Sequence, residues 1–406
     1  MMETLLNQLS SKDVWLQFQR YKTERNQLNR KELKQLGSFI QEERYLGITG
    51  DLSFSYPVKK QITKLGSAKK RTVYSYSEDE TWVLKLLAYL LYRYDEKISG
   101  NCYSFRRNMT AKTAFDRIRK IPDLNSRYVL KLDIHDYFNS IDTDQLLEML
   151  KSIIDDDLPL YEFLKDILTQ DRCMYNGKLI QEKRGAMAGV PLASFFANVY
   201  LLDLDGYFEE KGIPYFRYSD DMIIFFENEE QLQGNESFLR SFLAGKKLTL
   251  NQEKYHLSRP EEAWDFLGFT YRSGEIDLSD ITIEKMQGKI RRKAMKLFRE
   301  RKRKGLQYEK TARAMIRSFD QKFYDLTGRN DFTWIRFYFP VITSDKGLEK
   351  IDRYMLEYLR YLYSGRHYKG NYAIRYDTMK RLGYTPLKAE YYRWKKENEL
   401  LNRQAI

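Results

Sequence analysis

The chain has 406 residues, enough for two or three coupled subdomains with a sizeable interior. Its apolar fraction of 42%, charged fraction of 31% and two cysteines exclude a disordered chain and a disulfide-stabilised scaffold. The formal net charge of +13 favours a polyanionic partner, either nucleic acid or an anionic membrane. No apolar stretch approaches a membrane span in length and no signal pattern begins the chain, so we expect a cytoplasmic protein without a membrane partner.

The first 45 residues are polar and helix-prone, with one glycine and no proline, and predict a helical extension over 1–45. The segment 56–76 then places two β-prone runs around GSAKK and predicts a basic hairpin. The run EDETWVLKLLAYLLYRYDEKI follows with helical periodicity and an acidic start, which predicts a helix.

The central part of the chain alternates strand-like and helical segments. RYVLKLDIHDYFNSID (127–142) begins as a β-rich run and ends in a turn, and the next helix has Asp142 or Thr143 as its expected cap. PLASFFANVYLLDLDGYF (191–208) predicts one buried helix, entered through the segment GAMAGVP.

The segment YFRYSDDMIIFF (215–226) predicts a hairpin with apolar strands. A helix to about Lys247 and another short hairpin within 264–279 are expected next. Beyond Ile281 nearly the whole chain is predicted to be helical and is basic or aromatic.

The basic residues concentrate in one stretch of this last part. Between Glu284 and Arg317 there are fourteen Lys and Arg and three Glu, so that +11 of the total charge of +13 falls there. The stretch is either a site for a polyanion or an ordinary solvated helix face.

An aspartate stands at the end of the first central strand. In VLKLDIHDYF the alternation of strand residues places Leu130 and Leu132 on one face and Lys131 and Asp133 on the other. Asp133 is therefore expected to point away from the face that packs against the core.

Two more aspartates stand in the hairpin of YFRYSDDMIIFF. Ser219 and Asp220 are expected to form its two-residue turn, with Asp221 at the start of the second strand. Carboxylates on adjacent strand ends repel each other and are costly to bury unpaired, and divalent cations relieve both effects. Mg²⁺ prefers such oxygen ligands, and two ions about 4 Å apart promote phosphoryl transfer. An ordinary surface turn is the alternative interpretation.

Several motifs occur in a characteristic order from about Pro57 to Phe269, over half the chain. They are PVKKQITKLGSAKKRTVYSYSEDE, CYSFRRNMTAKTAFDRI (similar to YGFR…SA…A), LDIHDYFNSID, AGVPLASFFANVYL (similar to QGGPLSPLLANIYL), YSDD (similar to YADD or YMDD), LTLNQEKYHLS and FLGF. Together they resemble the reverse transcriptases, in particular the bacterial group that includes the group II intron enzymes.

The resemblance implies an α+β fold of the right-hand polymerase type, with fingers, a palm built of an antiparallel sheet plus helices, and a helical thumb. The expected division is an N-terminal helical extension (1–45), fingers (46–126), a palm with part of the fingers (127–280) and a basic helical thumb (281–406). A thumb in this place would bind a template and primer duplex through its phosphates.

The resemblance also implies the catalytic residues. Asp133, Asp220 and Asp221 match the catalytic aspartates, which hold two Mg²⁺ ions, or Mn²⁺ in their place. Asp220 is the expected direct ligand of both metals, and Asp221 the supporting acid.

Five residues match positions that bind the incoming nucleotide: Lys70, Arg71, Phe138, Gly189 and Lys254. Phe138 would screen the sugar 2′ position, and plain core is its alternative role. Arg71 is the preferred partner of the triphosphate, and Lys254 would donate a proton to the departing pyrophosphate unless it is a surface lysine.

Further residues match positions that contact the primer and the duplex. Phe266, Leu267 and Gly268 correspond to the primer grip. The thumb residues expected to bind nucleic acid are Arg291, Arg292, Lys293, Arg299 and Arg303.

The sequence also departs from the usual motifs. Ala188 stands where the family has Gln, Ala193 and Ser194 replace Ser and Pro, and Ser219 replaces Ala or Met. The SQ of diversity-generating enzymes, the NAxxH and VTG elements of retron enzymes, and an HNH cluster are not found. The remaining resemblance is to stand-alone bacterial reverse transcriptases, several groups of which act in defence against phage with a companion noncoding RNA.

The expected function is RNA-directed DNA synthesis, in which dNTPs are added to a primer and a dedicated noncoding RNA is copied into cDNA, with antiphage defence as the expected role. One alternative is a polymerase that extends without a template or from a protein hydroxyl. Another is an RNA-binding splicing cofactor of the maturase type. The sequence leaves the template, the primer, the fate of the cDNA and the oligomeric state open.

Overall fold

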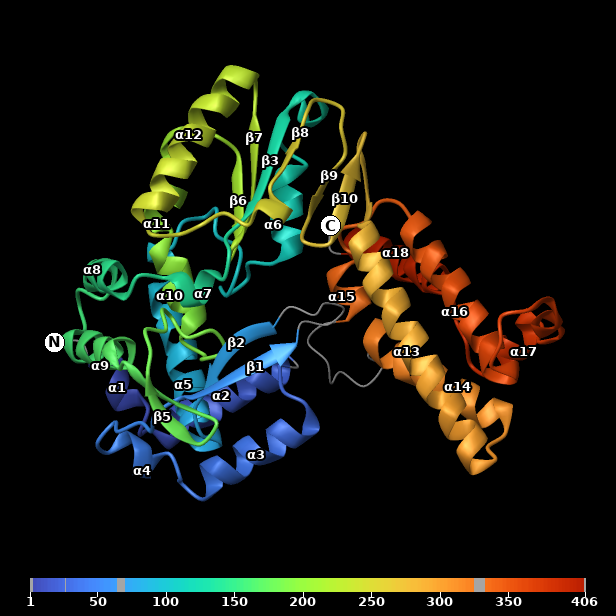
Figure 1. Ribbon diagram of the computed structural model, residues 1–406, viewed down its shortest axis with the longest axis horizontal. Coiled ribbons are helices and arrows are strands. Elements are labelled where there is room, and N and C mark those ends of the chain that lie inside the picture. The colour runs from blue at the N-terminus through green and yellow to red at the C-terminus, as the bar shows by residue number, and fades with distance from the viewer. Residues whose placement is uncertain (1–2, 26, 64–69, 325–332, 405–406) are drawn as a thin grey trace. The chain divides into compact units, whose positions relative to one another are not determined.

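The computed structural model describes residues 3–25, 27–63, 70–324 and 333–404, with side chains described up to 400 (Figure 1). Most of the predicted GSAKK loop lies outside these residues. The chain divides into two compact units, 1–261 and 262–406. This division falls within the expected palm (127–280), and the proposed four-part division stays a prediction. No helix in the described ranges is both long and apolar enough to cross a membrane.

The N-terminal extension is helical, as predicted. Its helices are α1 (Leu5–Gln8), α2 (Lys12–Glu24) and α3 (Arg30–Gln41), and α4 (Leu46–Thr49) follows directly after it. Trp15 of α2 is fully buried and packs its ring against Phe18, Phe39 and Tyr45. Because these rings join the main hydrophobic core of the first unit, the extension is part of that unit's interior.

A four-stranded sheet follows the extension. The predicted hairpin forms β1 (Val58–Thr63) and β2 (Lys70–Ser75), and the order of the sheet is β2-β1-β4-β5. The second hairpin, β4 (Arg172–Tyr175) and β5 (Lys178–Gln181), was not predicted from the sequence. Its signal was the Asn-Gly pair at 176–177, a dipeptide typical of two-residue hairpin turns.

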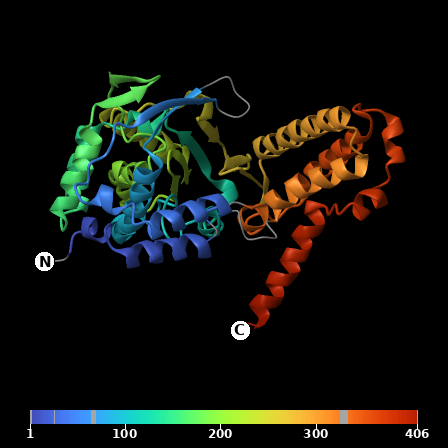
Figure 2. The same ribbon diagram turned by 90° about the horizontal axis from the view of Figure 1, so that it is seen from below.

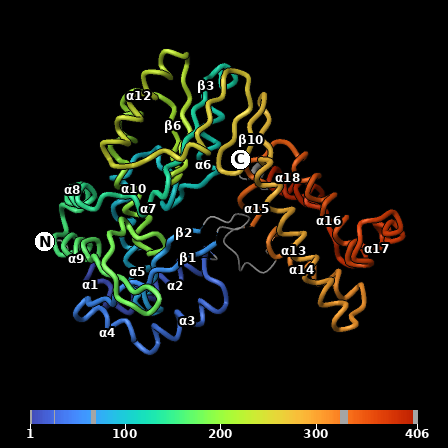
Figure 3. Tube along the Cα trace, in the orientation of Figure 1, coloured from blue at the N-terminus to red at the C-terminus, as the bar shows by residue number. Residues whose placement is uncertain are grey.

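The second sheet of this unit carries the aspartates. Its order is β6-β7-β3-β8, and all its pairings are antiparallel, as expected for the palm. Its strands are β3 (Tyr128–Asp133), β6 (Tyr215–Tyr218), β7 (Asp221–Phe226) and β8 (His256–Ser258). Helix α12 (Glu229–Gly245) lies along β3 and β7, which Figures 1 and 3 show from the same side.

The helices that connect the strands of the two sheets form the rest of the first unit. They are α5 (Glu78–Leu90), η1 (Leu91–Lys97), α6 (Ala111–Ile118), η2 (Leu124–Ser126), α7 (Tyr137–Ser140), α8 (Thr143–Ile153), α9 (Leu158–Thr169), α10 (Ala193–Tyr200), α11 (Leu202–Glu210) and η3 (Gln252–Lys254). Asp142 caps α8 by accepting a hydrogen bond from the Gln145 N–H, one of the two predicted caps. The prediction of one helix over 191–208 was wrong, because the backbone leaves the helical conformation at Leu201 (ψ 15°).

The second unit combines a small sheet with helices. The predicted hairpin within 264–279 is a three-stranded sheet of order β11-β10-β9. The remaining elements are β9 (Trp264–Phe266), β10 (Phe269–Arg272), β11 (Glu275–Leu278), α13 (Asp280–Lys304), α14 (Tyr308–Phe323), α15 (Trp334–Phe337), α16 (Lys346–Ser364), η4 (Lys369–Ala373), α17 (Tyr376–Arg381) and α18 (Leu387–Gln404). Figure 2 shows α18 leaving the bundle of α13, α14 and α16.

Candidate active site

The hairpin of YFRYSDDMIIFF forms as predicted. Tyr218 pairs with Asp221 across β6 and β7, and Ser219 and Asp220 make the turn. Ser219, the first of the two turn residues, has a positive φ of 63°. The two-residue turns that are common in β-hairpins require a positive φ at this position. The residues of β7 after Asp221 are all buried, so the core fixes the position of the turn.

The third aspartate arrives from the neighbouring strand. Asp133 is the register partner of Asp221 on β3, and the Ile134 N–H donates to the Asp220 carbonyl oxygen at 3.3 Å. Asp133 and Asp221 therefore stand at paired positions of two adjacent strands, and Asp220 precedes Asp221 in the turn. Leu130 and Leu132 belong to the main core, as expected for their face of β3, and Asp133 is nevertheless only 4% exposed, so its own surroundings are enclosed as well.

Two side chains hold the Asp133 carboxylate. The Lys254 ammonium forms an ion pair with Oδ2, and Asn251 Nδ2 donates to Oδ1 at 3.0 Å. The Asn251 N–H also donates to the Asp133 carbonyl oxygen at 2.8 Å, which ties η3 to the end of β3. Lys254 thus contacts Asp133 directly, and its charge also acts on Asp220 and Asp221, while its predicted role stays a prediction.

The surroundings of the other two aspartates disfavour their charged forms. Burial raises the pKa of Asp221 to about 6, with Lys131 opposing the shift and Asp133 adding to it. Burial also raises the pKa of Asp220, and the negative charge of Asp133 raises it further. Asp221 Oδ1 is buried and has no hydrogen-bond partner among the residues that the structure describes. A buried oxygen of this kind is costly unless a cation or a donor reaches it.

The donor set suits a hard divalent cation, since it consists of carboxylate oxygens on rigid strand ends. Within the described ranges, no three His, Cys, Asp or Glu side chains are grouped closely enough to hold a metal ion as they stand. The Asp133 carboxylate is occupied by the Lys254 ammonium, which supplies a positive charge at the same place.

Phe138 has an aromatic neighbour that the sequence interpretation missed. The ring of Phe105 lies 6.4 Å from that of Phe138 and 6.4 Å from that of Tyr218. Phe105 is 42% exposed and has a left-handed backbone (φ 54°), which is uncommon for a bulky residue. Its position in the motif similar to YGFR was the available signal.

The loop before α10 is fastened to β2. The Tyr74 N–H donates to the Ala188 carbonyl oxygen at 2.8 Å, and a side chain at Gly189 (φ 100°) would meet the Tyr74 carbonyl oxygen at 2.9 Å. Asn139 bridges the same parts, because its Nδ2 donates to the Thr72 carbonyl oxygen at 3.2 Å and its Oδ1 accepts from the Ala188 N–H at 3.1 Å. Gly189 is thus required for close approach of the backbone.

The predicted basic residues of β2 lie beside this junction. Lys70 and Arg71 are both exposed at the start of the strand. The positive charge of Arg71 opposes the rise in the pKa of Asp220, which places Arg71 within electrostatic reach of the turn.

The predicted primer grip belongs to the second unit. Leu267 (φ 50°) and Gly268 (φ 86°) form the turn between β9 and β10, and Phe266 is fully buried. The Gly268 carbonyl oxygen accepts hydrogen bonds from Thr282 Oγ1 at 2.9 Å and from the Ser279 N–H at 3.0 Å. The start of α13 therefore fixes the turn, and Phe266 serves the core.

The predicted nucleic-acid-binding residues of α13 do not share one face. Arg292, Arg299 and Arg303 line a groove together with Lys296, which the prediction missed. Lys293 is half-buried, and it lies near Lys322 of α14, whose pKa is lowered by burial and by neighbouring cations. Arg291 is exposed but does not line the groove.

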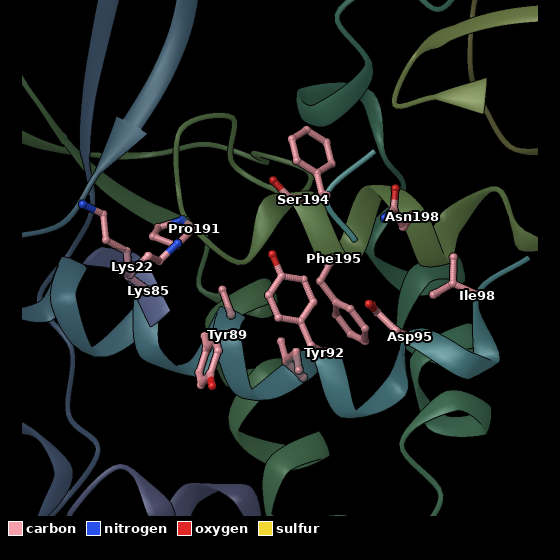
Figure 4. A pocket seen from close by; sticks show the side chains of 13 residues that line it. Lys22, Lys85, Tyr89, Tyr92, Asp95, Ile98, Pro191, Ser194, Phe195 and Asn198 are labelled. Atoms are coloured by element: carbon pink, nitrogen blue, oxygen red, sulfur yellow. The ribbon is translucent and has the colours of Figure 1, made fainter. Parts of the chain in front are cut away.

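A cavity of about 190 Å³ lies between α5, η1 and α10 in the first unit (Figure 4). Lys22, Lys85 and Tyr89 line one part of it, and Phe105 and Asn198 another. Burial lowers the pKa of Lys85. The cavity was not predicted, because its walls come from segments that are far apart in the sequence.

Comparison with known proteins gives three kinds of match. The family model described as "Reverse transcriptase (RNA-dependent DNA polymerase)" matches residues 59–271, just over half the chain, and this range contains Asp133, Asp220, Asp221 and Lys254. The retron Ec86 reverse transcriptase of Escherichia coli is 22% identical over 260 residues, which cover 62% of this chain and 73% of that protein.

Solved telomerase structures are also similar. The apo telomerase of Candida tropicalis has a TM-score of 0.49 at 12% identity, covering 82% of this chain and 60% of that one. A form of it truncated from the C-terminal domain has a TM-score of 0.45 at 15% identity, covering 56% of this chain and 55% of that one. This chain thus spans less than two thirds of both telomerase chains.

The family match agrees with the antiparallel sheet, the helices packed on it and the order of the motifs. The predicted α+β polymerase fold and the assignment to the RNA-directed DNA polymerases are confirmed. This chain belongs to the reverse transcriptase family.

Proposed function

We propose that this protein copies RNA into DNA by nucleotidyl transfer, with two Mg²⁺ ions, or Mn²⁺ in their place, held by Asp133, Asp220 and Asp221. Enzymes of the family generally use divalent metal ions, an RNA template and nucleotides. The observation that carries the proposal is the pairing of Asp133 with Asp221 on adjacent strands, with Asp220 in the turn between β6 and β7.

When bound, the two ions would activate the primer 3′ hydroxyl and stabilise the leaving pyrophosphate. Lys254 has two roles in this proposal. Before substrate binds, its ammonium forms an ion pair with Asp133 and neutralises the carboxylate. Once Asp133 binds another partner in place of Lys254, Nζ can donate a proton to a phosphate oxygen. Arg71 would add a charge-assisted hydrogen-bond donor for the triphosphate.

Sugar selection is proposed to rest on two aromatic rings. Phe138 would stand against the 2′ position of the incoming nucleotide, and Phe105 supports its ring from one side. The 2′ hydroxyl of a ribonucleotide would then clash with the Phe138 ring, which the Phe105 ring supports.

We further propose that the template is a dedicated noncoding RNA. Support comes from residues 360–381, at the end of α16 and beyond, where six Lys and Arg and five Tyr stand against one Asp. Tyr368 and Tyr372 are 53% and 64% exposed, and the Arg360 guanidinium lies 4.7 Å from the centre of the Tyr372 ring. Exposed aromatic rings beside cations are typical of surfaces that bind single-stranded nucleic acid.

A role in antiphage defence is the finer part of the proposal. It rests on the resemblance to stand-alone bacterial reverse transcriptases, and the similarity to a retron enzyme of E. coli is consistent with a bacterial lineage of this kind.

Sequencing the RNA and DNA that copurify with the protein tests the proposal. We expect one enriched RNA and DNA complementary to it, whereas Asp220→Ala should retain the RNA and lack the DNA. DNA without a complementary RNA would favour template-independent synthesis, and DNA covalently attached to the protein would favour priming by a protein hydroxyl. RNA without DNA in the wild type, together with activity in a splicing assay, would favour a maturase.

A further inference from the structure

A buried polar network lies directly behind the turn that carries Asp220. It joins one segment to three elements that lie much later in the sequence, and its side chains are Cys102, Ser104, Asn198, Asp205 and Arg217. All five are at most 2% exposed. We infer that Ser104 is a positioning residue of the active site, which holds the turn through a hydrogen bond to the backbone of Ser219. The evidence for this role is the hydrogen-bond network. Its effect on catalysis rests on the proposed function.

The network holds the backbone of Ser219 from both sides. The Ser219 N–H donates to Ser104 Oγ at 2.9 Å, and the Ser219 carbonyl oxygen accepts from Arg217 Nη1 at 3.4 Å. The Ser219 hydroxyl is itself buried and has no hydrogen-bond partner in the described part of the chain. The left-handed turn is therefore fixed by its peptide groups, and the next residue along the chain is Asp220.

Ser104 is in turn held by Asn198 of α10, which Figure 4 shows beside the cavity. Ser104 Oγ donates to Asn198 Oδ1 at 3.1 Å, and Asn198 Nδ2 donates back to the Ser104 carbonyl oxygen at 2.9 Å. This reciprocal pair sets the direction of the hydroxyl, so that a lone pair of its oxygen faces the Ser219 N–H.

The far side of the network is a buried ion pair. Arg217 and Asp205 are both fully buried, with Arg217 Nε donating to Asp205 Oδ1 at 2.7 Å, while Arg217 Nη2 donates to the Asn198 carbonyl oxygen at 3.2 Å. Removal of either charge would leave the other buried and unpaired, at a cost of several kcal/mol. Substitutions here would test folding, so Ser104 is the residue to change.

Ser104 also marks a departure of this chain from the usual motif. In the segment similar to YGFR, serine stands in the place of glycine. Glycine has no hydroxyl, so the bond to the Ser219 N–H depends on this serine. The donor is the backbone N–H of Ser219, so the departure at position 104 supplies the acceptor and the side chain at position 219 takes no part in this bond.

Loss of the bond would leave a buried N–H unpaired and loosen the turn relative to Asp133 on the neighbouring strand. Because displacements of about 1 Å in a catalytic group can cost about 100-fold in rate, we expect a large effect on metal use and on turnover. Ser104 touches neither substrate nor metal in this account, and KM for the dNTP should change little.

The first measurement uses the metal-free full-length protein and does not depend on activity. Hydrogen–deuterium exchange of the Ser219 amide should be at least about 10-fold faster in Ser104→Gly than in the wild type, as expected when a buried amide loses its acceptor. Cys102→Ala is the matched control, because Cys102 Sγ donates to Asn198 Oδ1 at 3.2 Å and lies 3.8 Å from Ser104 Oγ, but makes no bond to the Ser219 backbone within the described residues. It should lower the melting temperature and leave the exchange of Ser219 unchanged.

The second measurement titrates Mg²⁺ during DNA synthesis. Ser104→Gly should need about 10-fold more Mg²⁺ for half-maximal kcat, and Cys102→Ala should match the wild type. Glycine is used because the usual motif has it at this position, and Ser104→Ala should behave alike.

Wild-type exchange of Ser219 in Ser104→Gly would overturn the inference. Faster exchange with unchanged Mg²⁺ dependence would remove its catalytic part. Absence of Mg²⁺-dependent synthesis in the wild type would instead overturn the proposed function, and the exchange result would still stand or fall separately.

Discussion

The charged groups of the turn between β6 and β7 are mostly buried, whereas the basic groups of the groove on α13 are exposed to water. At the turn, Asp220 and Asp221 are largely enclosed, and their pKa values are raised because burial disfavours the ionised forms. On α13, the guanidinium groups of Arg292, Arg299 and Arg303 are exposed to water. Charge at the turn therefore depends on a few fixed partners, whereas charge on α13 acts through its sum and is screened by salt.

The comparison predicts that single substitutions have large effects at the turn and small ones on α13. Five changes, from the largest expected effect to the smallest, test this contrast.

Asp220→Ala should abolish DNA synthesis, with a loss of at least about 1,000-fold, because no neighbouring group can replace the carboxylate of the turn. Primer extension on an RNA template measures the loss, and circular dichroism checks the fold. Asp203→Ala is the control, since Asp203 is 61% exposed and pairs with Lys246 at the surface. Full activity in a folded Asp220→Ala protein would contradict the assignment of the site.

Lys254→Leu should lower kcat about 10-fold to 100-fold, because the proton donor and the partner of Asp133 are lost together. The pH–rate profile of the variant should differ from that of the wild type. Lys247→Leu is the control, because Lys247 forms an ion pair with Asp142 and is 65% exposed. A pH–rate profile identical to that of the wild type would remove the proposed proton transfer.

Phe138→Ala should raise the ratio of ribonucleotide to deoxyribonucleotide incorporation by about 10-fold or more, which corresponds to about 1.4 kcal/mol of discrimination. Phe105→Ala should raise the ratio less, since its ring supports Phe138 and does not itself face the sugar. Competition between the two nucleotides at one template position measures the ratio. Unchanged selectivity in Phe138→Ala would assign this ring to the core alone.

Asp221 makes the metal-free protein sensitive to pH. Its folded pKa of about 6 lies above its ordinary value, so its contribution to stability is full below about pH 4 and is lost as the pH rises through 6. Asp221→Asn cannot titrate, so between pH 4 and pH 7 it should gain up to about 3 kcal/mol relative to the wild type.

Thermal unfolding in EDTA at several pH values measures this relative gain. Added Mg²⁺ should reduce it at pH 7, because a cation stabilises the ionised wild-type site. A difference between the two proteins that stays constant with pH would contradict the role of burial at Asp221.

Arg299→Ala should weaken binding of an RNA–DNA duplex only about twofold to fivefold at 0.1 M salt, as expected for one phosphate contact. The slope of log affinity against log salt concentration should fall in magnitude by about 1. Arg353→Ala is the control, because Arg353 pairs with Glu349 within α16. A loss of 100-fold would mean that α13 also depends on individual fixed contacts.

The sequence predicted the local parts of the site well. Alternating apolar residues identified β3, a continuous apolar run identified β7, and the short polar turn between apolar strands placed Ser219 and Asp220 correctly. These features depend on neighbours in sequence, which periodicity records. The resemblance to the family then connected Asp133 with the hairpin, a pairing that periodicity alone does not contain.

The parts that were missed depend on contacts between distant segments. The ion pair of Lys254 with Asp133 joins residues 121 positions apart, and the bond of Ser104 to Ser219 joins residues 115 positions apart. The break at Leu201 was also missed, and α11 beyond it brings Asp205 to Arg217, a contact between two different elements. None of these contacts leaves a pattern in the sequence around either partner.

The hydrogen bonds between β2 and the loop before α10 also restrict how the first unit can move. Tyr74 bonds to Ala188, and Asn139 bonds to both Thr72 and Ala188. A hinge that passed between β2 and this loop would break the Tyr74–Ala188 bond and one of the two Asn139 bonds. Any movement of β2 should therefore carry the loop with it, and a hinge should lie elsewhere in the first unit.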